Sequence, residues 1–255
     1  TLWRQLQLDA FFEAHVDHEA ADVPWSRIAA VLAINRLCAP GSELAIEERW
    51  YPTTALDDLL HIPEGKINDS RLYRALDQVL PHKTALEGHL RARYGELFAA
   101  EFDVLLYDLT STYVEGAAPK NPMMRRGYSR DHRGDCLQVV LAVIVNIDGF
   151  PLSYETFDGD RTDVTTLETI MRMVERKYGR ARRVWVLDRG LVSEANLAAI
   201  RRRGGQYLVG TRRSQLRLVE RALLEGTWTH VRADVEAQLV TIPGGTETYV
   251  LCRSM

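Results

Sequence analysis

Two aspartates stand at the ends of short apolar stretches, where their carboxylates could hold a divalent cation. Asp108 follows residues 104–107 (VLLY), and Asp188 follows residues 184–187 (VWVL). A carboxylate beside a buried strand has to be paired, hydrogen-bonded or bound to metal, because removing it from water is costly. Carboxylate oxygens are preferred ligands of Mg²⁺ and Mn²⁺, and two such ions about 4 Å apart can promote a displacement at phosphorus.

A purely structural role is the alternative for each aspartate. Asp188 would then cap the turn at residues 189–190, and Asp108 would pair with a nearby arginine. A single aspartate at the end of a strand favours that alternative. Two aspartates on strands that the fold places side by side favour a shared site, so Asp108 and Asp188 are the candidate catalytic and metal-binding residues, with two Mg²⁺ or Mn²⁺ ions.

The elements that would position these aspartates begin near Phe102. Apolar stretches predict strands at 104–110, 137–147, 184–187 and 206–209, with a return strand at 150–157 after the Asp148-Gly149 turn. Apolar residues spaced three and four positions apart predict helices at 164–178 and 194–203. The order β-β-β-α-β-α-β is that of an RNase H-like core, an α/β (α+β) fold with a mixed sheet in which the first and fourth strands are parallel neighbours.

Helical patterns fill the first hundred residues. Pro24 is predicted in the first turn of one helix, Ser42 at the start of a helix that ends before Pro52, and Asn68 or Asp69 at the start of a third. After the core come a basic helix at 213–225 and a hairpin formed by 235–242 and 246–253. The sequence thus predicts a helical region at 1–100, the first part of the core at 101–212 and the start of a β-rich insertion at 213–255.

Charge is distributed unevenly along the chain. The net charge is −3, yet residues 1–70 hold twelve acidic and five basic residues, while residues 180–217 hold ten arginines and two acidic residues. Solvated helix faces are the ordinary explanation of such runs, but a basic region also suits a polyanion. The residues predicted to contact DNA are Lys120, Arg125, Arg126, Tyr128, Arg130, Arg133, Arg189, Arg212 and Arg213. Most would contact the phosphate backbone, and Tyr128 suits an unpaired base.

Other signals limit the class of protein. The three cysteines form neither a disulfide framework nor a zinc pattern. No signal peptide and no membrane-length apolar stretch is recognisable, so a cytoplasmic protein without a membrane partner is expected. The acidic stretch at 158–163 departs from a calcium loop, because no glycine stands at its sixth position, where that loop needs one. Thr162 or Asp163 is instead predicted to cap the next helix.

Four blocks together resemble the DDE transposases of bacterial insertion sequences, most closely the IS-four-like group. They are YDLTST at 107–112, GYSRDHR at 127–133, DGFPL at 148–152 and VLDRGLVS at 186–193. The resemblance spans roughly residues 25–255. It implies that Asp108 and Asp188 are the first two catalytic carboxylates and that the helical region serves DNA binding or dimerisation. It also implies a nucleoid-associated homodimer that acts on double-stranded DNA, at the element's ends and at the target.

The resemblance also implies a third carboxylate, a glutamate on a helix that follows a β-rich insertion. No glutamate of this sequence stands in that place, so the chain is expected to be a fragment whose third carboxylate lies beyond Met255, with weak metal binding and little or no DNA cleavage. Two other functions remain open. One is a catalytically dead DNA-binding remnant of a transposase. The other is a phosphatase of the haloacid dehalogenase type, although Thr110 stands where that chemistry needs an acid.

Overall fold

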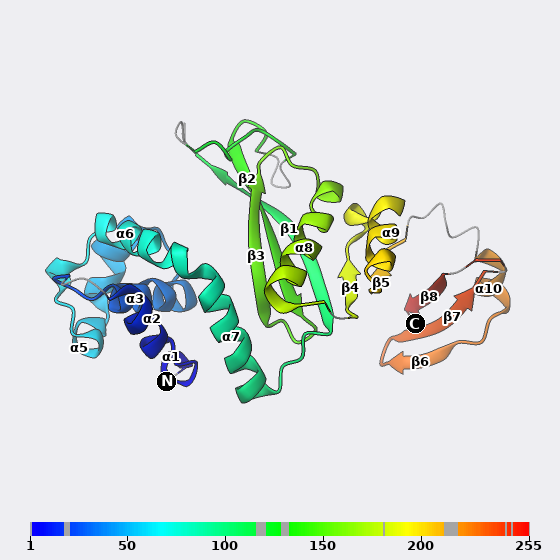
Figure 1. Cartoon of the computed structure of the whole chain (residues 1–255), viewed down its shortest axis with the longest axis horizontal. Coiled ribbons are helices and arrows are strands. Elements are labelled where there is room, and N and C mark those ends of the chain that lie inside the picture. The colour runs from blue at the N-terminus through cyan, green and yellow to red at the C-terminus, as the bar shows by residue number, and fades with distance from the viewer. Residues whose placement is uncertain are drawn as a thin grey trace.

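The computed structural model describes residues 2–17, 21–115, 121–128, 133–180, 182–211, 219–242, 244–245 and 247–254. Figure 1 shows three parts in sequence order: a group of helices at one end, a five-stranded sheet in the middle, and a three-stranded sheet at the other end. No single described helix is long and apolar enough to cross a membrane, although one pair of helices, bent by 94°, meets the test of length and composition.

The N-terminal part is helical, as predicted. Its elements are α1 Leu2–Gln5, α2 Leu8–Val16, α3 Trp25–Cys38, α4 Glu43–Ala45, η1 Ile46–Trp50, η2 Tyr51–Thr53, α5 Leu56–Leu60, η3 Glu64–Lys66, α6 Asp69–Val79, η4 Leu80–His82 and α7 Lys83–Phe98. Pro24 precedes α3, and the side chains of Ser42 and Asn68 cap α4 and α6. The prediction that the helix after Ser42 ends before Pro52 is wrong. The chain continues through the π-helical turn η1 into the 3₁₀ helix η2, where proline is tolerated in the first turn.

Tyr51 lies at the centre of this helical part. Its side chain is 2% exposed among Ile46, Ile62 and Leu72, and its hydroxyl donates a hydrogen bond to the Ile62 carbonyl at 2.8 Å. Burial away from water, with a smaller effect of Asp57, raises the pKa of Tyr51 to about 12. The neutral phenol is therefore a structural requirement of this core.

This burial predicts a loss of stability at high pH. Because the pKa of Tyr51 in the folded state exceeds the usual value of about 10, its neutral phenol contributes fully to the free energy of unfolding below pH 10. This contribution of about 2–3 kcal/mol is lost as the pH rises to 12. Tyr51→Phe is expected to cost about 1 kcal/mol at pH 8, through the lost hydrogen bond, and to shrink the loss at high pH. Urea unfolding at pH 8 and 11 measures both effects. An unchanged alkaline loss would contradict the prediction, and Tyr128→Phe is the exposed control.

The central sheet has the predicted RNase H-like order. Its strands are β1 Val104–Val114, β2 Leu137–Asn146, β3 Pro151–Asp158, β4 Val184–Leu187 and β5 Gln206–Val209, arranged β3-β2-β1-β4-β5. Strands β1, β2 and β3 pair antiparallel, whereas β4 is parallel to both β1 and β5. The mixed α/β class is confirmed, and the antiparallel first three strands exclude a doubly wound parallel sheet.

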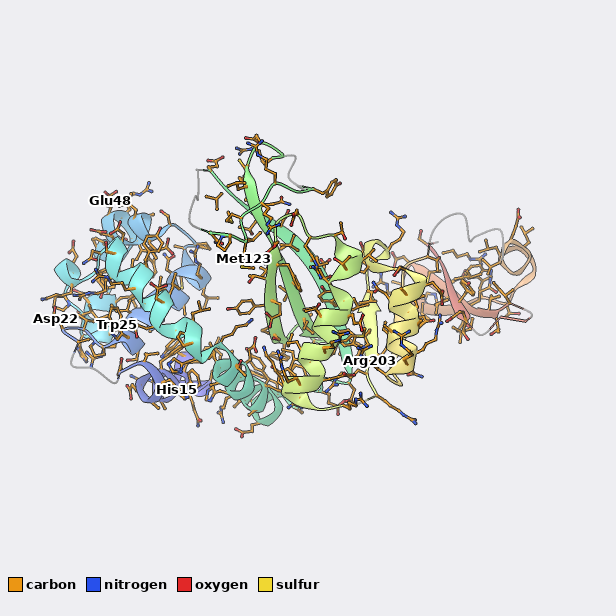
Figure 2. All side chains as sticks on the ribbon, turned by 45° about the horizontal axis from the view of Figure 1, so that its top comes forward. His15, Asp22, Trp25, Glu48, Met123 and Arg203 are labelled. Carbon is orange, nitrogen blue, oxygen red and sulfur yellow. The ribbon has the colours of Figure 1, made fainter. Side chains whose placement is uncertain are left out.

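Helices α8 Leu167–Tyr178 and α9 Glu194–Arg202 cover one face of this sheet (Figure 1). That covered face buries alternate strand residues such as Tyr107, Ile144 and Trp185 against them. Arg203, labelled in Figure 2, joins the two helices by reaching Glu168 at 3.3 Å. The predicted caps at Thr162 or Asp163 are wrong, because the short helix η5 Asp163–Thr165 comes first and Thr166 precedes α8.

The other side of the sheet, here called the open face, is less well covered. Its partly exposed side chains come from β1, β2 and β4 and include Leu106, Val143, Val145 and Val186. Leu208 of β5 is 53% exposed. Because side chains alternate along a strand, Asp108 also belongs to this face.

The C-terminal part is a second sheet. It contains β6 Thr229–Arg232, β7 Val235–Thr241 and β8 Thr248–Ser254 in the order β6-β7-β8, preceded by α10 Glu220–Glu225. The β7–β8 hairpin confirms the predicted one, while β6 was not predicted. Of the basic helix predicted at 213–225, the described residues contain α10, which begins at Glu220, and the part of the prediction at 213–218 lies outside the described residues.

A close crossing of backbones joins the segment at residues 121–128 to the ends of β2 and β3. Gly159 N donates to the carbonyl of Met123, which is labelled in Figure 2, at 3.0 Å. The buried Gln138 side chain donates through Nε2 to the carbonyls of Gly159 at 2.8 Å and Tyr128 at 3.1 Å. A Cβ on Gly127 would lie 2.0 Å from the Gly159 oxygen, so the crossing requires glycine.

Gly159→Ala is expected to destabilise the protein strongly. A Cβ at this position would lie 1.9 Å from the Gln138 carbonyl oxygen and 2.4 Å from that of Arg125, and backbone atoms cannot move aside cheaply. We expect a loss of about 3 kcal/mol or more in the free energy of unfolding, at the upper end of overpacking effects. Thermal or urea unfolding measures it, and Gly134→Ala, which would meet no atom within 4 Å, is the matched control. Equal stability of the two variants would contradict the prediction.

Candidate active site

The register of β1 and β4 places the two aspartates side by side. The last parallel pair is Tyr107 with Leu187, and Asp108 and Asp188 are the next residue of each chain segment. Neighbouring strands lie about 4.8 Å apart, so the two side chains leave the sheet at adjacent places. Both residues are exposed, and both line one cavity of about 410 Å³ on the open face.

The surroundings of the two carboxylates are mostly apolar. The cavity is also lined by Leu106, Val143, Val145 and Val186. The Oδ1 atom of Asp108 accepts a hydrogen bond from the Leu109 amide at 2.8 Å, which fixes the direction of that carboxylate. Apolar walls lower the local dielectric, so the attraction between such carboxylates and a cation is stronger here than in open water.

Asp188 does not have the capping role that the structural alternative gave it. It stands at the start of the short helix η6 Arg189–Leu191 with an extended backbone (φ −69°, ψ 156°), but its side chain makes no capping hydrogen bond. Capping of the turn therefore does not account for an acid at this position.

The donor set fits a hard divalent cation. Two adjacent carboxylates supply the protein ligands that Mg²⁺ or Mn²⁺ uses when water and substrate oxygens complete its shell. Among the residues that the structure describes, no group of three or more His, Cys, Asp or Glu could hold a metal ion. Within the described part of the chain, the site therefore offers two protein carboxylates.

Two of the arginines predicted to contact DNA are engaged with acidic side chains. Arg125 reaches Asp158 at 3.2 Å and Asp160 at 3.3 Å. Arg133 reaches Glu115 at 2.6 Å and Asp135 at 3.0 Å, and its hydrogen bonds hold the pKa of Asp135 at about 2. Much of their charge is locally balanced, and DNA contact by these two arginines stays a prediction.

Other predicted contacts are exposed on described segments. Arg126 and Arg189 are exposed, and Tyr128 has an exposed fraction of 85%. Arg189 directly follows Asp188, so its side chain starts from the edge of the candidate site. Lys120, Arg130, Arg212 and Arg213 lie outside the described residues.

One feature near the site was missed from the sequence. In the second half of β1, Thr110 and Ser111 line a second cavity together with Tyr128 and Arg161. The signal was present in the stretch at 158–163, where an arginine stands among three aspartates, but the stretch was interpreted only as a helix start. In the structure its first two acids pair with Arg125, and Arg161 lies at the cavity.

A model of the transposase DDE domain family matches residues 100–238. The search of curated proteins found no match. Among solved structures, the Mos1 transposase paired-end complex with the left transposon end aligns at 13% identity and a TM-score of 0.30, over 75% of this chain and 61% of that one. The piggyBac transposase synaptic complex with hairpin DNA aligns at 8% identity and a TM-score of 0.41, over 98% and 60%. This chain thus spans about three fifths of the length of those proteins.

Proposed function

Because this chain belongs to the transposase DDE domain family, whose model matches more than half of it, we propose that its central sheet is the catalytic core of a DNA transposase. The proposed reaction is metal-dependent cleavage of a DNA strand, followed by transfer of the freed 3′ end to target DNA. The observation that carries the proposal is the pairing of β1 with β4, which sets Asp108 and Asp188 next to each other in one cavity.

In this proposal Asp108 and Asp188 hold two divalent ions. When bound, such ions supply activation of the attacking oxygen and stabilisation of the leaving one. The chain's own contribution is position: the Leu109 amide orients the Asp108 carboxylate, and the rigid strand pair fixes the spacing of the two acids. The aliphatic side chains beside them limit water around the reacting phosphate.

DNA would be held mainly through its phosphates. Arg126 and Arg189 are exposed beside the core, and Lys120, Arg130, Arg212 and Arg213 extend the same set in the sequence. Such contacts are sequence-independent and weaken as salt concentration rises. We further infer a bacterial insertion sequence of the IS-four-like group and a nucleoid-associated homodimer that brings two element ends together.

A second candidate function is DNA binding without catalysis. It is favoured by one observation, namely that the described residues bring no third carboxylate to Asp108 and Asp188. Nicking of supercoiled plasmid in Mg²⁺ or Mn²⁺ separates the two functions: cleavage that Asp108→Asn abolishes supports the enzyme, and binding without any nicking supports the second candidate.

Iron substitution tests the proposed site without requiring turnover. Fe²⁺ bound in place of Mg²⁺ generates hydroxyl radicals with ascorbate and peroxide, and these cut whichever DNA lies beside the metal. We expect cuts confined to a few positions of a bound duplex, and their loss in Asp108→Asn and Asp188→Asn at unchanged DNA affinity. Asp77→Asn, on the exposed side of α6, is the control. Diffuse cutting that is equal in all four proteins would overturn the assignment.

A further inference from the structure

The strand pairing that brings Asp188 to the candidate site ends one residue before it. Both ladders of β4 stop at Leu187, which pairs with Tyr107 of β1 on one side and Val209 of β5 on the other. The sheet therefore fixes the backbone as far as Leu187. The position of Asp188 itself depends on the short turn that follows, η6.

This turn is held by the side chain of Asn196, which belongs to α9. The Leu191 amide donates a hydrogen bond to the Asp188 carbonyl at 3.0 Å and so closes η6. The Nδ2 atom of Asn196 donates to the carbonyl of the same Leu191 at 2.8 Å. A path of hydrogen bonds thus leads from the Asn196 side chain through Leu191 to the backbone of Asp188.

Asn196 is anchored to a second segment as well. It is only 6% exposed, and its Nδ2 atom also donates to the Val164 carbonyl at 2.9 Å. A side-chain amide nitrogen has two hydrogens, so both are engaged. The cap of α9 uses the backbone amide of Asn196, which donates to Ser193 Oγ at 3.1 Å, and leaves the side chain out. The side chain therefore serves to hold two carbonyls of two separate segments together.

The segment at 164–166 is linked in turn to the strand of Asp108. The side chain of Thr166 is fully buried, and its Oγ1 atom accepts a hydrogen bond from the Tyr107 hydroxyl at 2.7 Å. Tyr107 is 2% exposed and directly precedes Asp108 in β1. We call the connection formed by Tyr107, residues 164–166 and Asn196 the brace. It joins the residue before Asp108 to the turn after Asp188.

We propose that Asn196 is a positioning residue for the metal site, and that the brace sets where Asp188 stands relative to Asp108. Distances between a metal ion and its ligands are held to within about 0.2 Å, so a carboxylate on a short turn needs a fixed support. The brace lies on the covered face, whereas the two carboxylates belong to the open face, so it leaves the place of metal and substrate free. The inference rests on the proposed function, because it needs Asp188 to be a metal ligand.

The affinity for Mn²⁺, measured by electron paramagnetic resonance of the free ion, tests the brace. Asn196→Ala is expected to weaken Mn²⁺ binding at least about fivefold. That is less than the roughly tenfold to hundredfold losses that follow removal of a direct partner of a metal ligand, because Asn196 acts through the backbone. Tyr107→Phe keeps the aromatic ring in the core and removes the hydroxyl at the other end of the brace. It is expected to fold and to weaken binding about twofold.

Asn146→Ala is the matched control for the loss of a buried asparagine. Asn146 is 0% exposed, its Nδ2 atom donates to the Glu101 carbonyl at 2.9 Å, and its Oδ1 atom accepts from the Phe150 amide at 2.8 Å. It lies three residues along β2 from Val143, the partner of Asp108, which is about 10 Å. Both alanine variants are expected to unfold at lower urea concentration than the wild type, but Asn146→Ala should bind Mn²⁺ as the wild type does.

Hydrogen exchange of the metal-free chain gives a second measurement that needs no ligand. The Leu191 amide, which is bonded to the Asp188 carbonyl, is expected to exchange at least about tenfold faster in Asn196→Ala than in the wild type, because the turn opens locally. The Trp185 amide of β4 is the internal reference and should keep its rate. Equal acceleration at both positions would show general loosening of the core and would overturn the local role of Asn196.

The outcomes for Mn²⁺ separate the brace from the proposed function. Wild-type affinity in Asn196→Ala and in Tyr107→Phe, or equal weakening in Asn196→Ala and Asn146→Ala, overturns the brace. If Asp188→Asn still binds Mn²⁺ more weakly than Asp77→Asn, such a result leaves the proposed function standing. Mn²⁺ binding that Asp188→Asn does not weaken overturns both.

Discussion

Asp188→Asn is expected to weaken the binding of Mn²⁺ at least about tenfold. A unit charge about 4 Å from a divalent ion contributes about 2 kcal/mol even in water, and a tenfold change in affinity corresponds to about 1.4 kcal/mol. The apolar lining formed by Val143, Val145 and Val186 makes the effect larger rather than smaller. The same substitution removes one of two like charges that stand side by side, so the metal-free variant should be at least as stable as the wild type.

Electron paramagnetic resonance of free Mn²⁺ measures the affinity, and urea unfolding in EDTA measures the stability. Asp77→Asn removes an equal charge far from the site and controls for net charge. If Asp188→Asn and Asp77→Asn bind Mn²⁺ alike, the paired carboxylates are not the metal site. If Asp188→Asn instead destabilises the metal-free chain by several kcal/mol, the aspartate has the structural role that the sequence left open.

Lys177→Met is expected to cost about 3 kcal/mol of stability, because it leaves the charge of Glu87 buried without its partner. The Glu87 side chain is 8% exposed and the Lys177 side chain 11%, and Nζ lies 2.7 Å from Oε2. Ser153 of β3 donates to the other oxygen of Glu87 at 2.7 Å, so the pair joins α7, β3 and α8. Removing one member therefore loosens the contact between the helical part and the central sheet.

A double-mutant cycle separates the pair from its packing. Glu87→Met with Lys177→Met is expected to lie within about 1 kcal/mol of wild type, since apolar replacement of a buried pair is often neutral. Arg172→Ala, which removes the exposed pair with Glu168, should cost less than about 0.5 kcal/mol. A Lys177→Met cost no larger than that of Arg172→Ala would show that water still solvates Glu87.

The central strands could be predicted because each contains a short run of mostly apolar residues. The stretches at 184–187 and 206–209 are β4 and β5 to the residue, and the predicted hairpin differs from β2 and β3 by one residue at the ends. Strand β6 has only exposed residues, so no alternation of apolar and polar side chains indicates it in the sequence. Apolar residues at helical spacing are not always buried: Leu72 of α6 is buried, but Leu76 of α6 and Leu80 of η4 are 46% and 62% exposed.

The candidate site, too, could be predicted only in part from the sequence. Asp108 and Asp188 could be placed together because strand order and register follow from the order of the elements. The partners of Arg125 could not be foreseen, because they depend on how the segment at 121–128 crosses the ends of β2 and β3. Arg161 was missed for the same reason. The stretch at 158–163 shows an arginine among aspartates, but it does not indicate that this arginine lies beside Thr110, Ser111 and Tyr128 at a cavity.

The parallel pairing of β1 with β4 has a consequence for the order of folding. A hairpin and α8 separate the two strands in the sequence, so their pairing closes a long loop, and the entropy of closure is lost before any contact compensates for it. We therefore expect Asp108 and Asp188 to meet late, after the hairpin and α8 have formed. A cation held between them stabilises a contact that the transition state lacks. Its binding should slow unfolding of the core while leaving the refolding rate nearly unchanged.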